Sequence, residues 1–230
     1  MNTLSIGVVI PVYNEKGTIE EILKKVEAQP MVSEIVVVDD NSNDGTKEML
    51  KKYAGLDKYK IIFGEINSGK GASLRLGFKA AKSDVIIVQD ADLEYDPNDY
   101  SLLLDPILTD KADVVFGSRF LGGPHRIMYF WHYMVNIFLT LLPNMINNLN
   151  LTDMEVCYKV FRKSVLDKIE LKSDRFGFEP EITAKVAKLK VRIYEVPVRY
   201  YGRTYEEGKK IGWLDGVAAL WWILRFGFFK

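Results

Sequence analysis

The stretch of sequence that decides the fold is Val36-Val-Val-Asp-Asp-Asn-Ser-Asn-Asp-Gly-Thr46. Its continuous β-branched run is typical of a strand that is buried on both faces, as in a parallel sheet. Two adjacent carboxylates, Asp39 and Asp40, come at the end of this strand, where ligands bind in doubly wound folds. They are costly there unless they accept hydrogen bonds from a base or ribose, or help to organise a cation; helix capping into Gly45 is the alternative.

Strand-like runs alternate with helical patterns through the first half of the chain. Thr18 and Glu21 have capping-box spacing, and Ile19, Ile22 and Val26 fall on one face of the helix that follows. Repeated strand-helix-strand units predict right-handed crossovers and a mostly parallel α/β sheet with helices on both faces. The strand candidates are Ile6 to Ile10, Glu34 to Val38, Lys60 to Phe63, Val85 to Gln89 and Ala112 to Phe116. The second half predicts helices at 126–142 and 178–189, a strand at 191–200, and a mixed segment at 151–162.

Composition and charge limit the classes of protein that fit the chain. With 230 residues, 48% of them hydrophobic, it can bury the core of one α/β domain. Basic and acidic residues each number 31, so the overall charge gives no support for a nucleic-acid partner. The single Cys157 and the lack of a leader pattern predict a cytosolic protein. No apolar run reaches the roughly 20 residues of a spanning helix, because Asn136, Pro143 and Arg225 interrupt the candidates.

A second acidic motif, Asp90-Ala-Asp92, follows the strand candidate that ends at Gln89. Both carboxylates can turn towards one hard cation, and the small Ala91 leaves space for a ligand. Mg²⁺ or Mn²⁺ bridged to a diphosphate is the natural occupant of such a site. The motif alone is weak, and a solvated turn is the alternative, but its place after a buried strand favours the cation site.

Four motifs, taken in order, resemble the inverting family 2 glycosyltransferases of GT-A fold. They are Pro11-Val-Tyr-Asn-Glu15, the stretch from Val36 to Thr46, Gln89-Asp-Ala-Asp-Leu-Glu94 and Gly117-Ser-Arg119. Segments 151–162, 176–181 and 203–211 look like the branch of dolichyl-phosphate mannose synthases and polyprenyl-phosphate glucosyltransferases. We therefore expect residues 1–210 to form a GT-A catalytic domain and residues 211–230 an amphipathic, membrane-associating helix.

The resemblance implies a donor site at the carboxyl edge of the sheet. Asp92 and Glu94, with Asp90, would hold Mg²⁺ or Mn²⁺. The family often has glutamine where Glu94 stands, so this site would carry an extra negative charge. The residues that would contact the nucleotide sugar are Pro11, Tyr13, Glu15, Val38, Asp40, Asp90, Ala91 and Asp92.

The resemblance also implies a set of catalytic and acceptor-binding residues. Arg119, Arg126 and Arg203 would hold the acceptor phosphate. Near the end of the matched region, Lys210 would act with Arg203, and Lys209 is the alternative lysine. The catalytic residues would be Asp92, Arg119, Arg203 and Lys210.

The implied reaction transfers a hexose from GDP-mannose or UDP-glucose to a polyprenyl or dolichyl phosphate. A lipid phosphate is already ionised, so positioning and charge are enough. A hydroxyl acceptor would need a carboxylate base, and the candidates are Glu179, Glu181 and Asp153. A non-catalytic subunit that binds nucleotide sugar is another class. The turn from Gly64 to Gly71 nearly matches a P-loop, but Gly71 replaces the hydroxyl that holds Mg²⁺, which disfavours an NTPase.

Two apolar segments predict contact with a membrane surface. Between residues 127 and 142, His132, Asn136 and Thr140 recur every fourth position, so a helix there has a narrow polar stripe and a broad apolar arc. Such a helix packs in the core, forms a homo-oligomer or partner interface, or lies in the bilayer surface. We expect the protein on the cytoplasmic face of a membrane. In the tail, the residues predicted to share one face are Ile211, Leu214, Val217, Leu220, Trp221 and Leu224.

Overall fold

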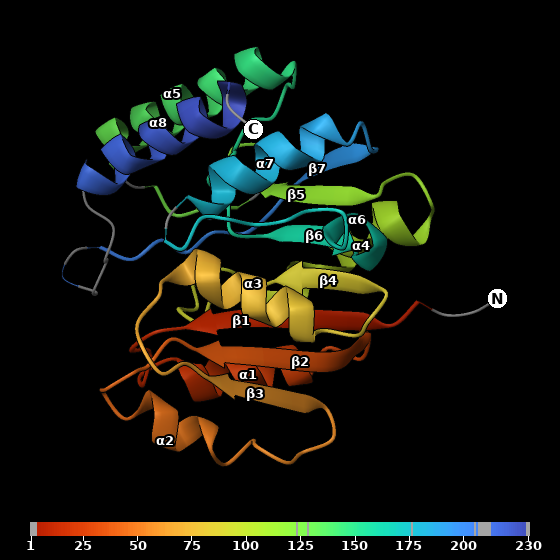
Figure 1. The fold of residues 1–230 in the computed structure, drawn as a ribbon, viewed down its shortest axis with the longest axis vertical. Helices are drawn as coiled ribbons and strands as arrows, with labels where there is room; N and C mark the ends of the chain where they lie inside the picture. Colours follow the sequence, from red (N-terminus) through yellow and green to blue (C-terminus); the bar gives the residue numbers. More distant parts are fainter. Residues whose placement is uncertain are drawn as a thin grey trace.

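The computed structural model describes residues 4–122, 124–127, 129–175, 177–204, 206 and 213–228. In this part of the chain, seven strands form one sheet in the order β3-β2-β1-β4-β6-β5-β7 (Figure 1). Only β6 runs antiparallel to its neighbours, so the predicted mostly parallel α/β sheet is confirmed. The strands are β1 (Ile6–Val12), β2 (Val32–Asp39), β3 (Tyr59–Phe63), β4 (Val85–Val88), β5 (Val114–Ser118), β6 (Lys159–Arg162) and β7 (Ile193–Pro197).

Helices cover both faces of the sheet, with α3 in front of it and α1 behind it in the view of Figure 1. α1 buries the face that the sequence predicts, because Ile19, Ile22 and Val26 are fully buried. The valines of β2 are buried as well, as expected of a central parallel strand. These helices are α1 (Ile19–Glu27), α2 (Thr46–Leu50), α3 (Lys70–Ala80), α4 (Tyr100–Leu108), α6 (Lys163–Leu166) and α7 (Phe178–Lys188).

The antiparallel strand β6 was not predicted from the sequence, where residues 151–162 were expected only to form a mixed segment. β6 pairs with β4 through Val160 and Ile87, and with β5 through Val160 and Val115. Because β6 runs against these neighbours, its first residue, Lys159, lies at the edge where β4 and β5 end. The loop before β6 is therefore placed at the carboxyl edge of the sheet, among the predicted site residues.

Two further helices, α5 (Phe130–Asn147) and α8 (Trp213–Phe228), lie side by side at one end of the molecule (Figure 1). Leu139 of α5 packs with Ala219 and Ile223 of α8 in a small apolar cluster that is separate from the main core. The predicted polar stripe of α5 faces inward, where Thr140 Oγ1 accepts a hydrogen bond from Met154 N at 3.0 Å.

The opposite face of α5 exposes an apolar arc, because its polar stripe is the side that packs against the protein. Trp131 is 76% exposed and Phe138 is 51% exposed. Among the described helices, none is both long enough and apolar enough to cross a bilayer. In the tail, Trp221 and Leu224 are exposed and Leu220 is partly buried. Ile211 and the side chains of Leu214 and Val217 lie outside the described residues.

Candidate active site

The turns that follow β1 and β2 are bound to one another at the carboxyl edge of the sheet. Asn14 N donates a hydrogen bond to Ser42 Oγ at 2.9 Å, and Glu15 N donates to Thr46 Oγ1 at 3.0 Å. The two strands are also in register here, with Pro11 opposite Val38, and Tyr13 is partly exposed above them. The structure thus brings together the residues predicted to contact the nucleoside from the first two motifs.

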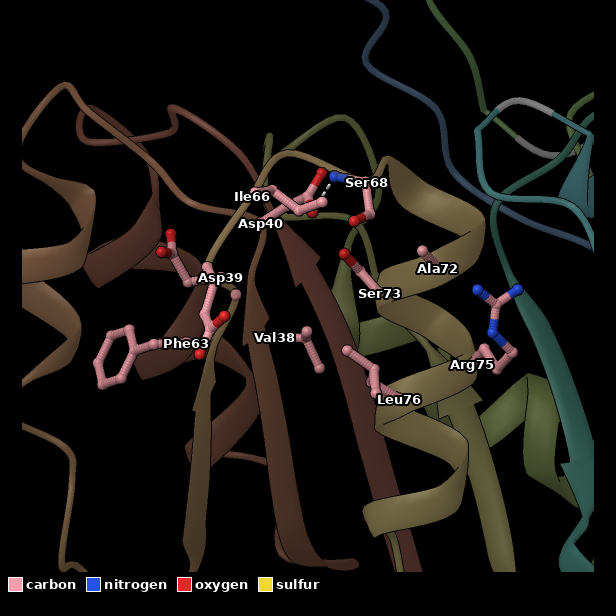
Figure 2. Close-up of a pocket in the computed structure, with 12 residues that line it drawn as sticks. Val38, Asp39, Asp40, Phe63, Ile66, Ser68, Ala72, Ser73, Arg75 and Leu76 are labelled. Carbon is pink, nitrogen blue, oxygen red and sulfur yellow. Dashed lines mark hydrogen bonds between the residues drawn. The ribbon is translucent and has the colours of Figure 1, made fainter.

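A pocket of about 350 Å³ opens between the ends of β2 and β3 and the start of α3 (Figure 2). Val38, Asp40 and Ser68 are among the residues that line it. The Asp40 carboxylate accepts hydrogen bonds from Ser68 N at 2.8 Å and Gly69 N at 2.7 Å, so it fixes the loop that closes the pocket. Gly69 has a φ of +95°, and an added Cβ would lie 2.5 Å from Asp174 O, so glycine is required there.

Arg203 is bound among three carboxylates of the predicted donor site. Its Nη2 lies 3.0 Å from Asp92 Oδ2, its Nε lies 3.4 Å from Glu94 Oε1, and its Nη1 lies 3.6 Å from Glu15 Oε2. Its backbone N–H also donates to Glu94 Oε1 at 2.9 Å. Two of the acids predicted to bind the metal, Asp92 and Glu94, are therefore held together by a guanidinium group from a segment more than one hundred residues later in the chain.

Lys70 holds the third predicted metal ligand, Asp90, in a separate ion pair. Its Nζ lies 3.0 Å from Asp90 Oδ1 and 2.9 Å from Glu179 Oε1. Although burial lowers it, the charges of Asp90 and Glu179 hold the pKa of Lys70 well above its usual value. Lys70 was not predicted as a site residue. Its signal was the near P-loop pattern, in which Lys70 occupies the lysine position.

The electrostatics of the acidic motif favour a cation. Burial, followed by the charges of Asp90 and Glu94, raises the pKa of Asp92 to about 7, against the opposing effect of Arg203. Such carboxylate oxygens are the donors that Mg²⁺ and Mn²⁺ prefer. Within the described residues, no three His, Cys, Asp or Glu side chains form a ready-made metal site. A divalent ion that bound Asp92 and Glu94 would compete with Arg203 for the same oxygens.

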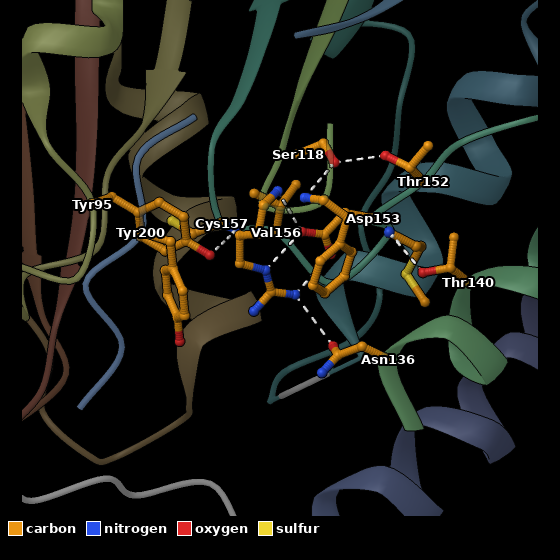
Figure 3. Close-up of polar contacts among 12 residues, drawn as sticks. Tyr95, Ser118, Asn136, Thr140, Thr152, Asp153, Val156, Cys157 and Tyr200 are labelled. Carbon is orange, nitrogen blue, oxygen red and sulfur yellow. Dashed lines mark hydrogen bonds and ion pairs between the residues drawn. The ribbon is translucent and has the colours of Figure 1, made fainter. Parts of the chain in front are cut away.

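Arg119, at the end of β5, forms a buried ion pair with Asp153. Its Nε lies 2.6 Å from Asp153 Oδ2 and its Nη2 lies 2.7 Å from Oδ1, a bidentate arrangement. Its Nη2 also donates to Asn136 Oδ1 at 3.2 Å. Figure 3 shows Asn136 and Thr140 pointing from α5 towards Asp153 and the neighbouring loop. Arg119 is therefore held rigidly at the point where α5 meets the sheet.

The segment at residues 199–204 brings the remaining predicted arginines to the same edge. Arg126 N donates to Tyr200 O at 3.0 Å, and Arg126 Nη1 donates to Gly202 O at 3.2 Å. The Tyr200 hydroxyl donates to Glu94 Oε2 at 3.1 Å, beside Arg203. Lys210 and the alternative Lys209 lie outside the described residues.

The three carboxylates considered as a general base are all engaged in the structure. Asp153 is fully buried in its pair with Arg119, and Glu179 pairs with Lys70. Glu181 is also fully buried, and it accepts hydrogen bonds from Lys172 N and Ser173 N, both at 2.7 Å. A carboxylate that is bound in this way is poorly placed to accept a proton from a substrate hydroxyl.

Comparison with known proteins finds a matching family, similar sequences and a similar fold. The model of Glycosyl transferase family 2 matches residues 7–170. The undecaprenyl-phosphate mannosyltransferase of Micrococcus luteus is 31% identical over 222 residues, which cover 92% of this chain and 90% of that protein. The dolichol-phosphate mannosyltransferase of Pyrococcus furiosus is 30% identical over 91% of this chain and 60% of its own length. The fold is similar to that of glucosyl-3-phosphoglycerate synthase from Mycobacterium tuberculosis, which was crystallised with Mn²⁺, uridine diphosphate and phosphoglyceric acid. The TM-score is 0.75 at 17% identity, and the match covers 99% of this chain and 80% of that chain.

Proposed function

The chain belongs to glycosyl transferase family 2 and is a glycosyltransferase, and from this premise we propose that it transfers a hexose from a nucleotide diphosphate sugar to the phosphate of a polyprenyl lipid. The similarity to two prenyl-phosphate mannosyltransferases supports this class of acceptor. The observation that carries the proposal is the hydrogen bond between Arg119 and Asn136. This bond links Arg119 of the site directly to α5, a helix with an exposed apolar face.

The donor would bind at the ends of β1, β2 and β4. Pro11, Val38 and Asp40 would contact the nucleoside beside the pocket, and the diphosphate would lie next to Asp92 and Ala91. Mg²⁺ or Mn²⁺ held by Asp92 and Glu94, with Asp90, would neutralise charge on the departing diphosphate. Lys70 is half-buried next to Asp90 and partly offsets the negative charge on this side of the site.

The acceptor phosphate would bind beside the segment at residues 199–204. Arg126 is bound to this segment through Gly202 O, and Arg203, which belongs to the segment, donates its backbone N–H to Glu94. Arg119 would help to shape this side of the site, since Asp153 and Asn136 hold its guanidinium in place. A phosphate oxygen is already charged, so alignment with the anomeric carbon and stabilisation of the leaving group would carry the reaction.

The engaged carboxylates favour a phosphate acceptor over a hydroxyl acceptor. A hydroxyl nucleophile needs a base within hydrogen-bond reach, and the three candidates are bound to Arg119, Lys70 or the backbone of residues 172–173. A phosphate nucleophile needs none. This difference supports transfer to a lipid phosphate without general-base catalysis.

A membrane surface would cover the apolar arc of α5. Trp131 and Tyr133 are exposed on this helix, and Trp221 is exposed on α8 beside it. Aromatic side chains of this kind lie at headgroup depth in interfacial helices. We include residues 211–230 in this membrane-associating surface, next to the catalytic domain at residues 1–210.

One incubation tests the proposed reaction. Purified protein is mixed with Mg²⁺ or Mn²⁺, a short polyprenyl phosphate and a panel of UDP-sugars and GDP-sugars, and the lipid fraction is analysed by mass spectrometry. We expect one glycosyl polyprenyl phosphate, and no product with Asp92→Asn. Consumption of a donor with a free alcohol or glycan as acceptor, but not with the lipid phosphate, would refute the proposal.

A further inference from the structure

The loop before β6 is built around a buried lysine. Lys159 is fully buried, and its Nζ donates hydrogen bonds to Met154 O, at 3.0 Å, and to Val156 O. These two carbonyl groups flank Glu155, so the lysine fixes the backbone on both sides of that residue. Burying an ammonium group costs several kcal/mol unless its protons are bonded, and the loop supplies those bonds. The position of Glu155 is therefore set by the fold.

The side chain of Glu155 is incompletely satisfied. Among the described residues, no group donates a hydrogen bond to its buried Oε1 atom. An unpartnered buried oxygen of this kind costs about 1–3 kcal/mol, so it requires an explanation. Burial, followed by the charge of Glu179, raises the pKa of Glu155 to about 8, against the opposing effects of Lys159 and Arg119. This rise favours the protonated carboxyl group, which can both donate and accept a hydrogen bond.

Other buried carboxylates in the same region are satisfied by the fold. Glu181 accepts hydrogen bonds from Lys172 N, Ser173 N and Ser173 Oγ. Glu195 accepts from Thr152 N at 2.8 Å and from the N–H of the next residue at 3.2 Å. A purely structural Glu155 would show the same kind of bonding. Its unused oxygen indicates instead a partner from outside the described residues, and we take this partner to be a ligand.

Glu155 lies between the two halves of the site. On one side, its chain neighbour Asp153 binds Arg119, which we assign to the acceptor phosphate. On the other side, Glu179 acts on its charge and is linked through Lys70 to Asp90, which we assign to the donor diphosphate. In a direct displacement, the transferred sugar must lie between these two phosphate groups. A sugar held between them would therefore lie in the region of Glu155.

We propose that the Glu155 carboxyl group binds a hydroxyl group of the hexose in the donor and helps to determine which sugar is accepted. This inference rests on the proposed function, because it requires a sugar between a diphosphate and an acceptor. A neutral carboxyl group suits this position, since it pairs with a hydroxyl group and does not repel the incoming phosphate. A hydrogen bond from such a site discriminates strongly against a sugar that lacks the hydroxyl group.

Donor binding tests the inference without the acceptor. Calorimetry with Mg²⁺ compares UDP-glucose with UDP, and GDP-mannose with GDP, for wild type, Glu155→Leu, the isosteric Glu155→Gln and the exposed control Glu170→Gln. We expect Glu155→Leu to weaken binding of the nucleotide sugar by about tenfold or more and to leave binding of the nucleoside diphosphate unchanged. Glu155→Gln is expected to retain part of the affinity, and Glu170→Gln all of it.

Deoxy analogues of the preferred donor identify the hydroxyl group. One of them should bind wild type more weakly than the parent sugar does, and Glu155→Leu should bind that analogue and the parent equally. The inference is overturned if Glu155→Leu changes binding of the sugar and the nucleoside diphosphate alike, or of neither. Failure of the proposed function would be seen separately, as an absence of glycosylated lipid from wild-type protein.

Discussion

Replacing Arg203 with glutamine is expected to tighten Mn²⁺ binding by about tenfold, while it reduces glycosyl transfer. The guanidinium group is 21% exposed and lies 3.0 Å from Asp92, 3.4 Å from Glu94 and 3.6 Å from Glu15. A partly exposed contact of this kind contributes about 0.5 kcal/mol, so the three together contribute about 1.5 kcal/mol. A metal ion that takes the same oxygens must first displace this interaction, and 1.5 kcal/mol corresponds to about one factor of ten in Kd.

Electron paramagnetic resonance of free Mn²⁺ measures this affinity directly, without substrate or turnover. Wild type and Arg203→Gln are titrated alongside Lys16→Gln, which removes an equal charge from an exposed residue next to Glu15 in the chain. We expect tighter binding only in Arg203→Gln. Equal tightening in Lys16→Gln would show that the change in Mn²⁺ affinity comes from net charge alone. Unchanged or weaker binding in Arg203→Gln would refute the competition between the arginine and the metal ion.

Three further predictions follow from individual contacts. Lys70→Met leaves Asp90 and Glu179 without their cation. Urea unfolding should therefore show that the free energy of unfolding falls by about 3 kcal/mol, and donor binding should be weaker. Hydrogen bonds from Arg192 lower the pKa of Asp113 to about 2, so this pair stabilises the fold above about pH 4 and is lost as the pH falls to 2. Thermal unfolding should therefore show that Asp113→Asn lowers the free energy of unfolding, relative to wild type, by about 1 kcal/mol at pH 6 and not at all near pH 2. Trp131→Ser should weaken co-sedimentation with anionic vesicles by about tenfold, whereas Leu56→Ser, an equally apolar change at a distant exposed site, should not.

The parallel part of the fold was predictable because its strands are buried on both faces. Short, continuous β-branched runs such as Val36 to Val38 favour buried strands, and the amphipathic pattern of α1 fixes the side that it buries. β6 was not predictable on the same grounds. It is only four residues long and begins at Lys159, a residue type that rarely lies in a core. Its burial depends on carbonyl groups of its own loop, which periodicity does not reveal.

The acidic half of the site was predictable for a topological reason. Parallel strands place the residues that follow them along one edge, so motifs from Pro11, Asp40 and Asp90 had to converge. The basic partners were not predictable in the same way. Arg203 and Lys70 reach these acids from positions that no local rule links to them, and only the tertiary structure shows which carboxylates remain available.

The orientation of α5 determines how the site meets its surroundings, because the polar side of the helix faces the site and the apolar side faces outward. Its apolar arc is exposed among the described residues, so we expect an external surface to cover it. The inward polar stripe places Asn136 on Arg119 and Thr140 on the loop that carries Glu155. A lipid surface that docks on α5 would bring the phosphate of a prenyl lipid to the edge of the sheet where the arginines lie. A second copy of the chain on the same face would instead separate the site from the lipid, so a stable dimer that no longer binds vesicles would contradict the assignment of this surface.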